Sequence, residues 1–314
     1  MSKKPELVVA PKDILELKDL ANAGADAFIV GDARFALVPR GSFDEKLLAE
    51  AIHCGKDLNK KIYLQMDAIF TNDILLQLDA FLAQIAHLNF DGIRVADLGA
   101  YWLVKEKLPN RPIHLVDGMM LTNHETVNYW ANKGIKRMRL AHELTMDEVL
   151  EIKQNATAEI EVLIQGVPLM FTSRRKLLDN YLEFQRQLGK DVTLSVDKNF
   201  LFDQERHLYY PMIQNDHGTH IYGGSDVCMI DDLRGMIDKE IDGIYIESAT
   251  YGTDELIKII HFYEMAIDLA IEAPDKYEKV GLGLYREIEK LKQANMMMDR
   301  GFYYKPTIYK NQTK

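Results

Sequence analysis

The sequence predicts a (β/α)8 barrel, an α/β fold in which eight parallel strands alternate with helices. Short runs rich in apolar and β-branched residues recur along the chain, and stretches with helical periodicity separate most of them. Because the runs are almost continuously apolar, we expect strands buried on both faces, as in a parallel sheet. An open doubly wound sheet is the alternative, but no G-x-G-x-x-G pattern follows an early strand. The eight runs cover residues 7–11, 27–32, 61–67, 92–99, 113–119, 136–143, 159–166 and 243–248.

The helices between these strands are indicated by amphipathic stretches that follow capping residues. Thr145 and Glu148 have the spacing of a capping box, in which each satisfies a free backbone N–H of the other. The amphipathic stretches are 44–54, 73–88, 123–132 and 145–154. The expected caps are Ser42, Asn72, Asn123 and Thr145.

The regular alternation breaks once, between the seventh and eighth strands, where roughly 75 residues intervene. A helix is expected to open near Ser173, and residues 193–224 indicate short strands with turns at 203–204 and 216–218. We expect a β-rich insertion, residues 189–224, over the carboxyl-terminal mouth of a barrel spanning residues 1–275. After a helix at about 254–273, the C-terminal part, 276–314, is expected to hold a helix at 285–298 and an aromatic tail.

Composition limits the function. The chain has 314 residues and a net charge of −10, which disfavours direct electrostatic binding of nucleic acid by this chain alone. No apolar run approaches the ~18 residues of a membrane helix, and the first residues lack a secretory signal pattern. Two cysteines, Cys54 and Cys228, cannot build a disulfide framework. These features predict a reduced cytoplasmic protein.

Polar residues follow many of the predicted strands, at the barrel face where active sites lie. Asp32 and Asp97 are best explained as turn or cap residues. The candidates for acid–base chemistry, or for metal binding through oxygen and nitrogen, are Asp67, Asp117, His142, Glu143 and Glu247.

Other candidate sites have weaker signals. Arg40, Arg94 and Arg139 could clamp a small anion, although strand alternation leaves the direction of Arg94 and Arg139 open. His217 and His220 are close enough for a metal site, but without an H-E-x-x-H helix a polar turn is the better interpretation. No cofactor or metal site is assigned.

Several segments carry a resemblance to a known family. Residues 24–43, 113–130, 134–152 and 223–248 are similar, in order, to segments of the peptidase U32 family, the collagenase-like proteases. Residues 159–181 resemble its pattern E-x-F-x-H-G-x-x-C-x(6)-C. In that register Gln165 replaces the family histidine, whereas Leu169 and Lys176 replace two cysteines, and Cys228 matches another. One thiolate cannot hold an iron–sulfur cluster, which generally needs three or four ligands.

The resemblance is nearest to a shorter, cysteine-poor paralogue implicated in prephenate-dependent tRNA wobble-uridine hydroxylation. It implies a subunit without a cluster, paired with a longer, cluster-bearing paralogue or with itself. It also implies that tRNA is reached through the complex and that a prephenate-like anion is a ligand. Two alternatives stay open: a U32-type peptidase of undefined catalytic type, and a non-catalytic binder of a small anionic metabolite.

Overall fold

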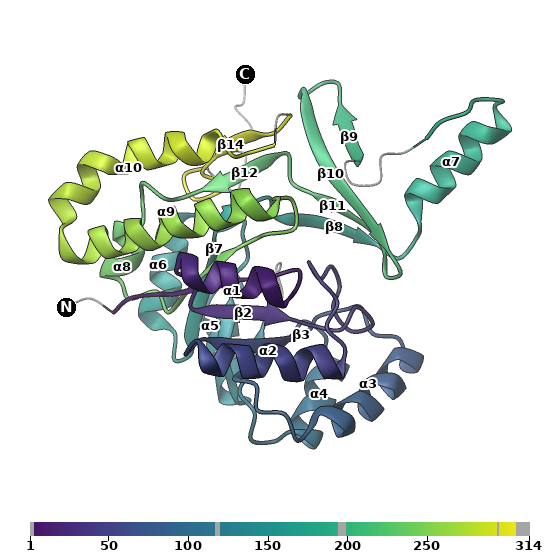
Figure 1. The fold of residues 1–314 in the computed structure, drawn as a ribbon, viewed down its shortest axis with the longest axis horizontal. Coiled ribbons are helices and arrows are strands. Elements are labelled where there is room, and N and C mark those ends of the chain that lie inside the picture. The colour runs from purple at the N-terminus through teal and green to yellow at the C-terminus, as the bar shows by residue number, and fades with distance from the viewer. Residues whose placement is uncertain (1–2, 117–119, 194–198, 294, 306–314) are drawn as a thin grey trace.

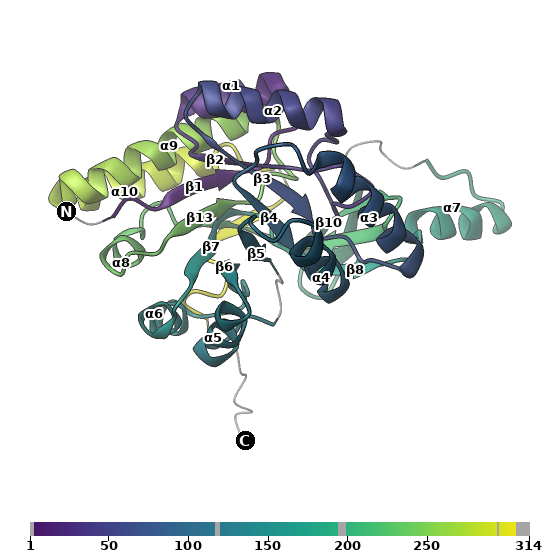
Figure 2. The same ribbon diagram turned by 90° about the horizontal axis from the view of Figure 1, so that it is seen from below.

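A closed barrel of eight parallel strands forms the body of the computed structural model (Figures 1 and 2). The structure describes residues 3–116, 120–193, 199–293 and 295–305. Each strand pairs in parallel with the next, and β13 pairs with both β1 and β7, which closes the barrel and confirms the predicted fold. The barrel strands are β1 (Glu6–Val9), β2 (Ala27–Val30), β3 (Lys61–Met66), β4 (Gly92–Val95), β5 (Ile113–Leu115), β6 (Ile135–Arg139), β7 (Glu159–Gly166) and β13 (Gly243–Ile246).

Helices cover the outside of the barrel and bury their apolar faces against the strands (Figure 2). Within the described residues, no helix is long and apolar enough to cross a membrane. The helices that connect barrel strands are α1 (Ile14–Ala23), α2 (Glu45–Asp57), α3 (Asn72–Ile85), α4 (Leu98–Lys107), α5 (His124–Asn132), α6 (Met146–Asn155) and α8 (Arg234–Asp238).

Two of the four predicted helix caps are confirmed. Asn123 accepts a hydrogen bond at the start of α5, and Thr145 forms the capping box of α6. Ser42 was the wrong residue for α2, because the carboxylate of Asp44 accepts the capping bond and lies closer to the helix. Asn72 is the first residue of α3 rather than its cap.

The connection between the seventh and eighth barrel strands contains a second, four-stranded antiparallel sheet with the order β8-β11-β10-β9. Strands within 193–224 are therefore present. The sheet also includes β8, which occupies Ser173, so the following helix begins at Leu177 rather than near Ser173. The elements of this unit are β8 (Leu169–Ser173), α7 (Leu177–Gln187), β9 (Asn199–Asp203), β10 (Leu208–Asn215) and β11 (Gly218–Tyr222).

The C-terminal part differs from the sequence prediction. Helix α9 (Thr253–Glu272) lies where it was expected, but α10 spans Pro274–Glu289 instead of 285–298. Residues Met297–Asp299 form β14, which pairs in parallel with β12 (Ser225–Cys228). The helix prediction failed there because pairing with a distant strand outweighs local helical propensity. The division of the chain at residue 275 stays a prediction.

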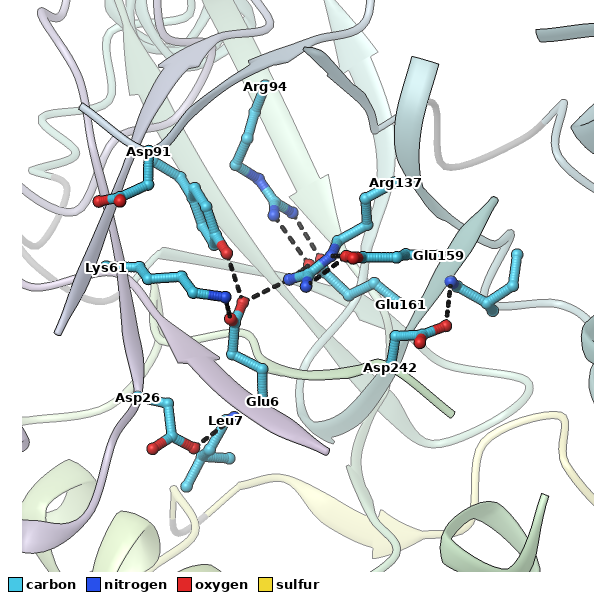
Figure 3. Close-up of polar contacts among 12 residues, drawn as sticks. Glu6, Leu7, Asp26, Lys61, Asp91, Arg94, Arg137, Glu159, Glu161 and Asp242 are labelled. Carbon is cyan, nitrogen blue, oxygen red and sulfur yellow. Dashed lines mark hydrogen bonds and ion pairs between the residues drawn. The ribbon is translucent and has the colours of Figure 1, made fainter. Parts of the chain in front are cut away.

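The barrel interior holds a network of buried charges (Figure 3). Arg94, only 2% exposed, points inward and donates to the fully buried Glu161, with N–O distances of 2.9 and 2.6 Å. Arg137 pairs with Glu159 at 2.7 Å and also with Glu6. Burial alone would favour neutral Glu161, but the neighbouring arginines outweigh it and lower its pKa to about 2. Cations and carboxylates therefore compensate each other below the barrel mouth.

Candidate functional site

A cavity of about 510 Å³ opens at the carboxyl-terminal mouth of the barrel, the predicted place for a site. Barrel strand ends form most of its wall, and β8 of the inserted sheet forms the rest. A smaller recess of about 70 Å³ shares part of this lining and reaches Arg94. The two hollows share Leu37, Asp67, Arg139, Leu169, Tyr245 and Glu247.

Asp67 lies directly after β3 and is held in place by two donors. Its carboxylate accepts hydrogen bonds from the backbone N–H of Leu37 and from Nε2 of Gln65, both at 2.9 Å. A carboxylate fixed in this way can orient a hydroxyl group of a ligand.

Glu247 lies after β13 and faces the same cavity. It accepts hydrogen bonds from the hydroxyl of Tyr245 at 2.9 Å and from the backbone N–H of Ala249 at 3.1 Å. Burial raises the pKa of Glu247, the nearby Asp67 adds to the rise, and Arg139 opposes it. Glu247 is therefore the carboxyl group of the cavity best suited to hold and donate a proton.

Arg139, at the end of β6, is the cation of the cavity. Its Nη2 donates to the carbonyl of Val116 at 3.4 Å, and its guanidinium lies 4.8 Å from the ring centre of Tyr245. It makes no ion pair with a described residue. Arg40 instead pairs with a buried glutamate at 2.8 Å, and Arg94 pairs with Glu161. Of the three predicted anion clamps, Arg139 lines the larger cavity and has no ion-pair partner among the described residues, whereas Arg40 and Arg94 line the smaller recess and are paired with carboxylates.

The other predicted site residues have different positions. His142 lines the cavity, and burial together with the charge of Arg139 lowers its pKa, so its imidazole is neutral near pH 7. Glu143 is exposed and does not line the cavity. Asp117 lies outside the described residues. A catalytic role for these residues stays a prediction.

The two aspartates interpreted as cap or turn residues do have those roles. Asp97 accepts from the backbone N–H of Ala100 at 2.9 Å and caps α4. Asp32 accepts from the backbone N–H of Arg34 at 2.9 Å and pairs with its guanidinium.

The positions aligned with the family's sulfur ligands do not meet in one pocket. Leu169 lines the cavity, Lys176 is exposed and pairs with Asp216 at 3.4 Å, and Cys228 is buried in the core. Burial raises the pKa of the Cys228 thiol to about 12, so it stays protonated. These side chains do not fit an iron–sulfur cluster.

The rest of the described structure also offers no cluster of side chains that could bind a metal ion. In the described ranges, no three His, Cys, Asp or Glu side chains come together in a way that could hold a metal ion. His217 bonds the carbonyl of Ala33 at 2.7 Å, whereas His220 bonds Asn215 at 2.9 Å. His217 lies in the predicted turn, whereas His220 is fully buried in β11, so the interpretation as a polar turn is wrong for His220.

The sequence prediction missed two parts of the cavity, Tyr245 and the β8 wall. Tyr245 stands two residues before Glu247, and alternate residues of a strand share a face. That spacing could have identified it. Residues 169–172, which form the β8 wall, belong to the separate four-stranded sheet. No local sequence pattern indicates that this sheet borders the cavity.

Comparison with known proteins identifies the family. The model of peptidase family U32 matches residues 12–313. The tRNA hydroxylation protein P2 of Bacillus subtilis is 37% identical over 311 residues, 98% of this chain and 100% of the relative. The tRNA hydroxylation protein P1 of the same organism is 24% identical over 88% of this chain and 66% of its own length. The tRNA hydroxylation protein P of Escherichia coli is 26% identical over 84% of this chain and 68% of its own length. The chain belongs to peptidase family U32.

Proposed function

We propose that this chain takes part in tRNA hydroxylation at the wobble uridine. The observation that carries the proposal is the likeness to tRNA hydroxylation protein P2, which extends over the full length of that relative. The matched region spans the segments that carry the cavity as well as the rest of the barrel. A shared fold alone would be weaker support, because one fold hosts many functions.

The cavity supports a small organic anion as ligand, of the prephenate type. Arg139 has no carboxylate partner in the described part of the chain, and guanidinium groups bind carboxylates through two parallel hydrogen bonds. Leu140, Leu163 and Met170 offer apolar surface to a ring. The negative charges of Asp67 and Glu247 would repel a second carboxylate, and the raised pKa of Glu247 lessens this repulsion because it favours the neutral carboxyl group.

The existence of a longer U32 relative beside a shorter one in the same organism supports a role of this chain as one subunit of a pair. P1 and P2 are separate proteins of Bacillus subtilis, and this chain spans all of P2 but about two thirds of P1. The net charge of −10 and the lack of a cluster-forming cysteine set leave tRNA binding and redox chemistry to a partner. We therefore assign this chain the part of the subunit without a cluster, which holds the small anion.

The experiment is deletion of the gene followed by mass spectrometry of the nucleosides of total tRNA. The hydroxylated wobble uridine should fall, and the wild-type gene should restore it. A gene carrying Arg139→Met should not restore it, whereas Arg234→Met, an exposed arginine on α8, should. Unchanged hydroxylation after deletion would contradict the proposal.

The peptidase alternative rests on the family's name and on the two carboxylates that face the cavity. Both cysteines are buried, so neither is an available nucleophile. Hydrolysis of gelatin by the purified protein, lost in Glu247→Gln, would favour that alternative over tRNA hydroxylation.

A further inference from the structure

A buried tyrosine with an unused hydroxyl group lies beside the site described above. Tyr222 is the last residue of β11, and its side chain is only 1% exposed. Its hydroxyl makes no hydrogen bond with a described residue, although buried tyrosine hydroxyls usually have a partner. Tyr222 lines the smaller recess, the hollow of about 70 Å³ at the barrel mouth. The partner of this hydroxyl is therefore to be sought in the recess.

The pairing of β11 with β8 brings Tyr222 to the barrel mouth (Figure 1). The register skips Met170, so Tyr222 lies opposite Leu169, which lines both the recess and the larger cavity. Directly opposed residues of an antiparallel pair share one face of the sheet. Bulges of this kind commonly re-aim a side chain beside a site. The irregular register therefore places Tyr222 on the face that borders the recess.

The two ends of the Tyr222 side chain have different surroundings. The residue packs in a small apolar cluster with Val167 and Met296. Burial raises the pKa of the Tyr222 hydroxyl, and the nearby Glu247 and Asp67, which both line the recess, raise it further. The hydroxyl is therefore close to the acidic groups of the recess and stays protonated, so it can donate a hydrogen bond there.

Several other polar side chains of the recess already have protein partners. The guanidinium groups of Arg40 and Arg94 are each paired with a buried carboxylate. The hydroxyl of Ser248 donates to a backbone carbonyl at 2.9 Å. Arg139 differs, because it has no carboxylate partner among the described residues and its Nη2 donates over a long 3.4 Å to a backbone carbonyl. Arg139 and Tyr222 are therefore two donors of the recess that a ligand can use.

The volumes of the two hollows limit the ligand. A water molecule takes roughly 30 Å³ of liquid, so the recess of about 70 Å³ holds a few waters or the few atoms of a carboxylate group. The larger cavity, of about 510 Å³, has room for a ring. Carboxylate oxygens are the strong acceptors that match a guanidinium and a hydroxyl donor. An acid whose carboxylate stands on a short arm from a ring fits both hollows at once.

We propose that the recess is the subsite for the carboxylate of a ring-bearing acid, and that the hydroxyl of Tyr222 donates to this carboxylate together with Arg139. Tyr222 is then a specificity-determining residue supplied by the inserted sheet, because a ligand without the carboxylate leaves its hydroxyl unpaired. The choice of an anionic ligand rests on the proposed function, whereas the position of the subsite comes from the contacts, burial and volumes above.

The test measures binding to the full chain by isothermal titration calorimetry with two matched probes. Phenylpyruvate carries a carboxylate on a two-carbon arm from its ring, and phenylacetone has a methyl group in place of that carboxylate. Wild type should bind phenylpyruvate at least about tenfold more tightly than phenylacetone. Tyr222→Phe should weaken binding of phenylpyruvate, and of prephenate, by about tenfold or more and leave any binding of phenylacetone unchanged. Tyr210→Phe, in β10 and outside both hollows, should bind phenylpyruvate within about twofold of wild type.

Two further measurements separate a ligand contact from a structural role. If both donors hold one carboxylate, the double variant Tyr222→Phe with Arg139→Met should lose less affinity than the product of the two single losses. In the free chain, Tyr222→Phe should keep or raise the melting temperature, because the hydroxyl that it removes has no described partner. Tyr251→Phe is the contrast, since its hydroxyl bonds the buried Asp226 at 2.6 Å, and its melting temperature should fall by at least about 2 °C.

Binding of phenylpyruvate by Tyr222→Phe at wild-type affinity would overturn the proposal, and so would a free Tyr222→Phe chain that melts as low as Tyr251→Phe. Single losses that multiply in the double variant would put the two donors on different groups and reject the shared carboxylate. A wild-type chain that binds neither phenylpyruvate nor prephenate would also overturn it. The gene deletion tests tRNA hydroxylation separately. Acid binding that depends on Tyr222, with hydroxylation unchanged after deletion, would support the subsite and contradict the proposed function.

Discussion

Replacing Glu161 by glutamine tests whether the charged barrel interior stabilises the fold. The substitution keeps the shape of the side chain but leaves the guanidinium of Arg94, 2% exposed, without its anionic partner. Breaking a buried ion pair by removing one partner typically costs 3–5 kcal/mol. The pKa of Glu161, lowered from 4.5 to about 2, corresponds independently to about 3 kcal/mol. Urea unfolding at pH 7 should therefore show a loss of about 3 kcal/mol or more.

The pH dependence gives the sign of the effect. A carboxyl group with a lowered pKa stabilises the fold at pH values above its unfolded pKa, and that contribution is lost as the pH falls through the folded pKa. For Glu161 the window runs from about 4.5 down to about 2. The difference between wild type and Glu161→Gln should thus shrink by about 1 kcal/mol by pH 3.5.

Glu159→Gln is the matched control, because Glu159 lies on the same strand and also binds an arginine but has a 48% exposed side chain. Its loss should stay below about 1 kcal/mol. Equal losses for both variants, or a Glu161→Gln effect that does not change down to pH 3.5, would refute the argument.

Two further predictions concern the cavity. Arg139→Met should weaken prephenate binding by about 1.5–3 kcal/mol, some tenfold to a hundredfold in calorimetry, with the melting temperature unchanged; equal affinity would remove Arg139 from the site. Gly166→Ala should destabilise the fold by about 3 kcal/mol, because Gly166 has φ of +106° and an added Cβ would lie 2.2 Å from the Glu247 carbonyl. Gly283→Ala, in α10 with open space around it, should instead stabilise by about 0.5–1 kcal/mol in the same thermal unfolding series.

The barrel was predictable because its signal is local. Each strand is a short apolar run, and parallel pairing in chain order follows from the helices between the runs. The end of a strand is also a local feature, so the sequence alone places Asp67 and Glu247 at one mouth of the barrel. The same reasoning named His142, which does line the cavity.

Features that depend on contacts between distant segments were not predicted from the sequence. Arg94 and Glu161 are 67 residues apart, so neither residue indicates the other in the sequence. Residues 297–299 form a strand only because β12 offers them an edge. The arginines at alternate positions of β6 and the glutamates at alternate positions of β7 share one face of each strand, and this spacing was a usable sign of charges inside the barrel.

The charged interior and the anion cavity are linked through Tyr245. The guanidinium of Arg94 lies 5.9 Å from the centre of its ring, and that of Arg139 lies 4.8 Å away. Arg94 is neutralised by Glu161 and Arg139 is open, so one cation faces the ligand although two lie near it. The two arginines therefore differ in whether a carboxylate partner neutralises the guanidinium. In the proposed binding of an anion, the Arg94–Glu161 pair would leave Arg139 as the guanidinium available to the ligand.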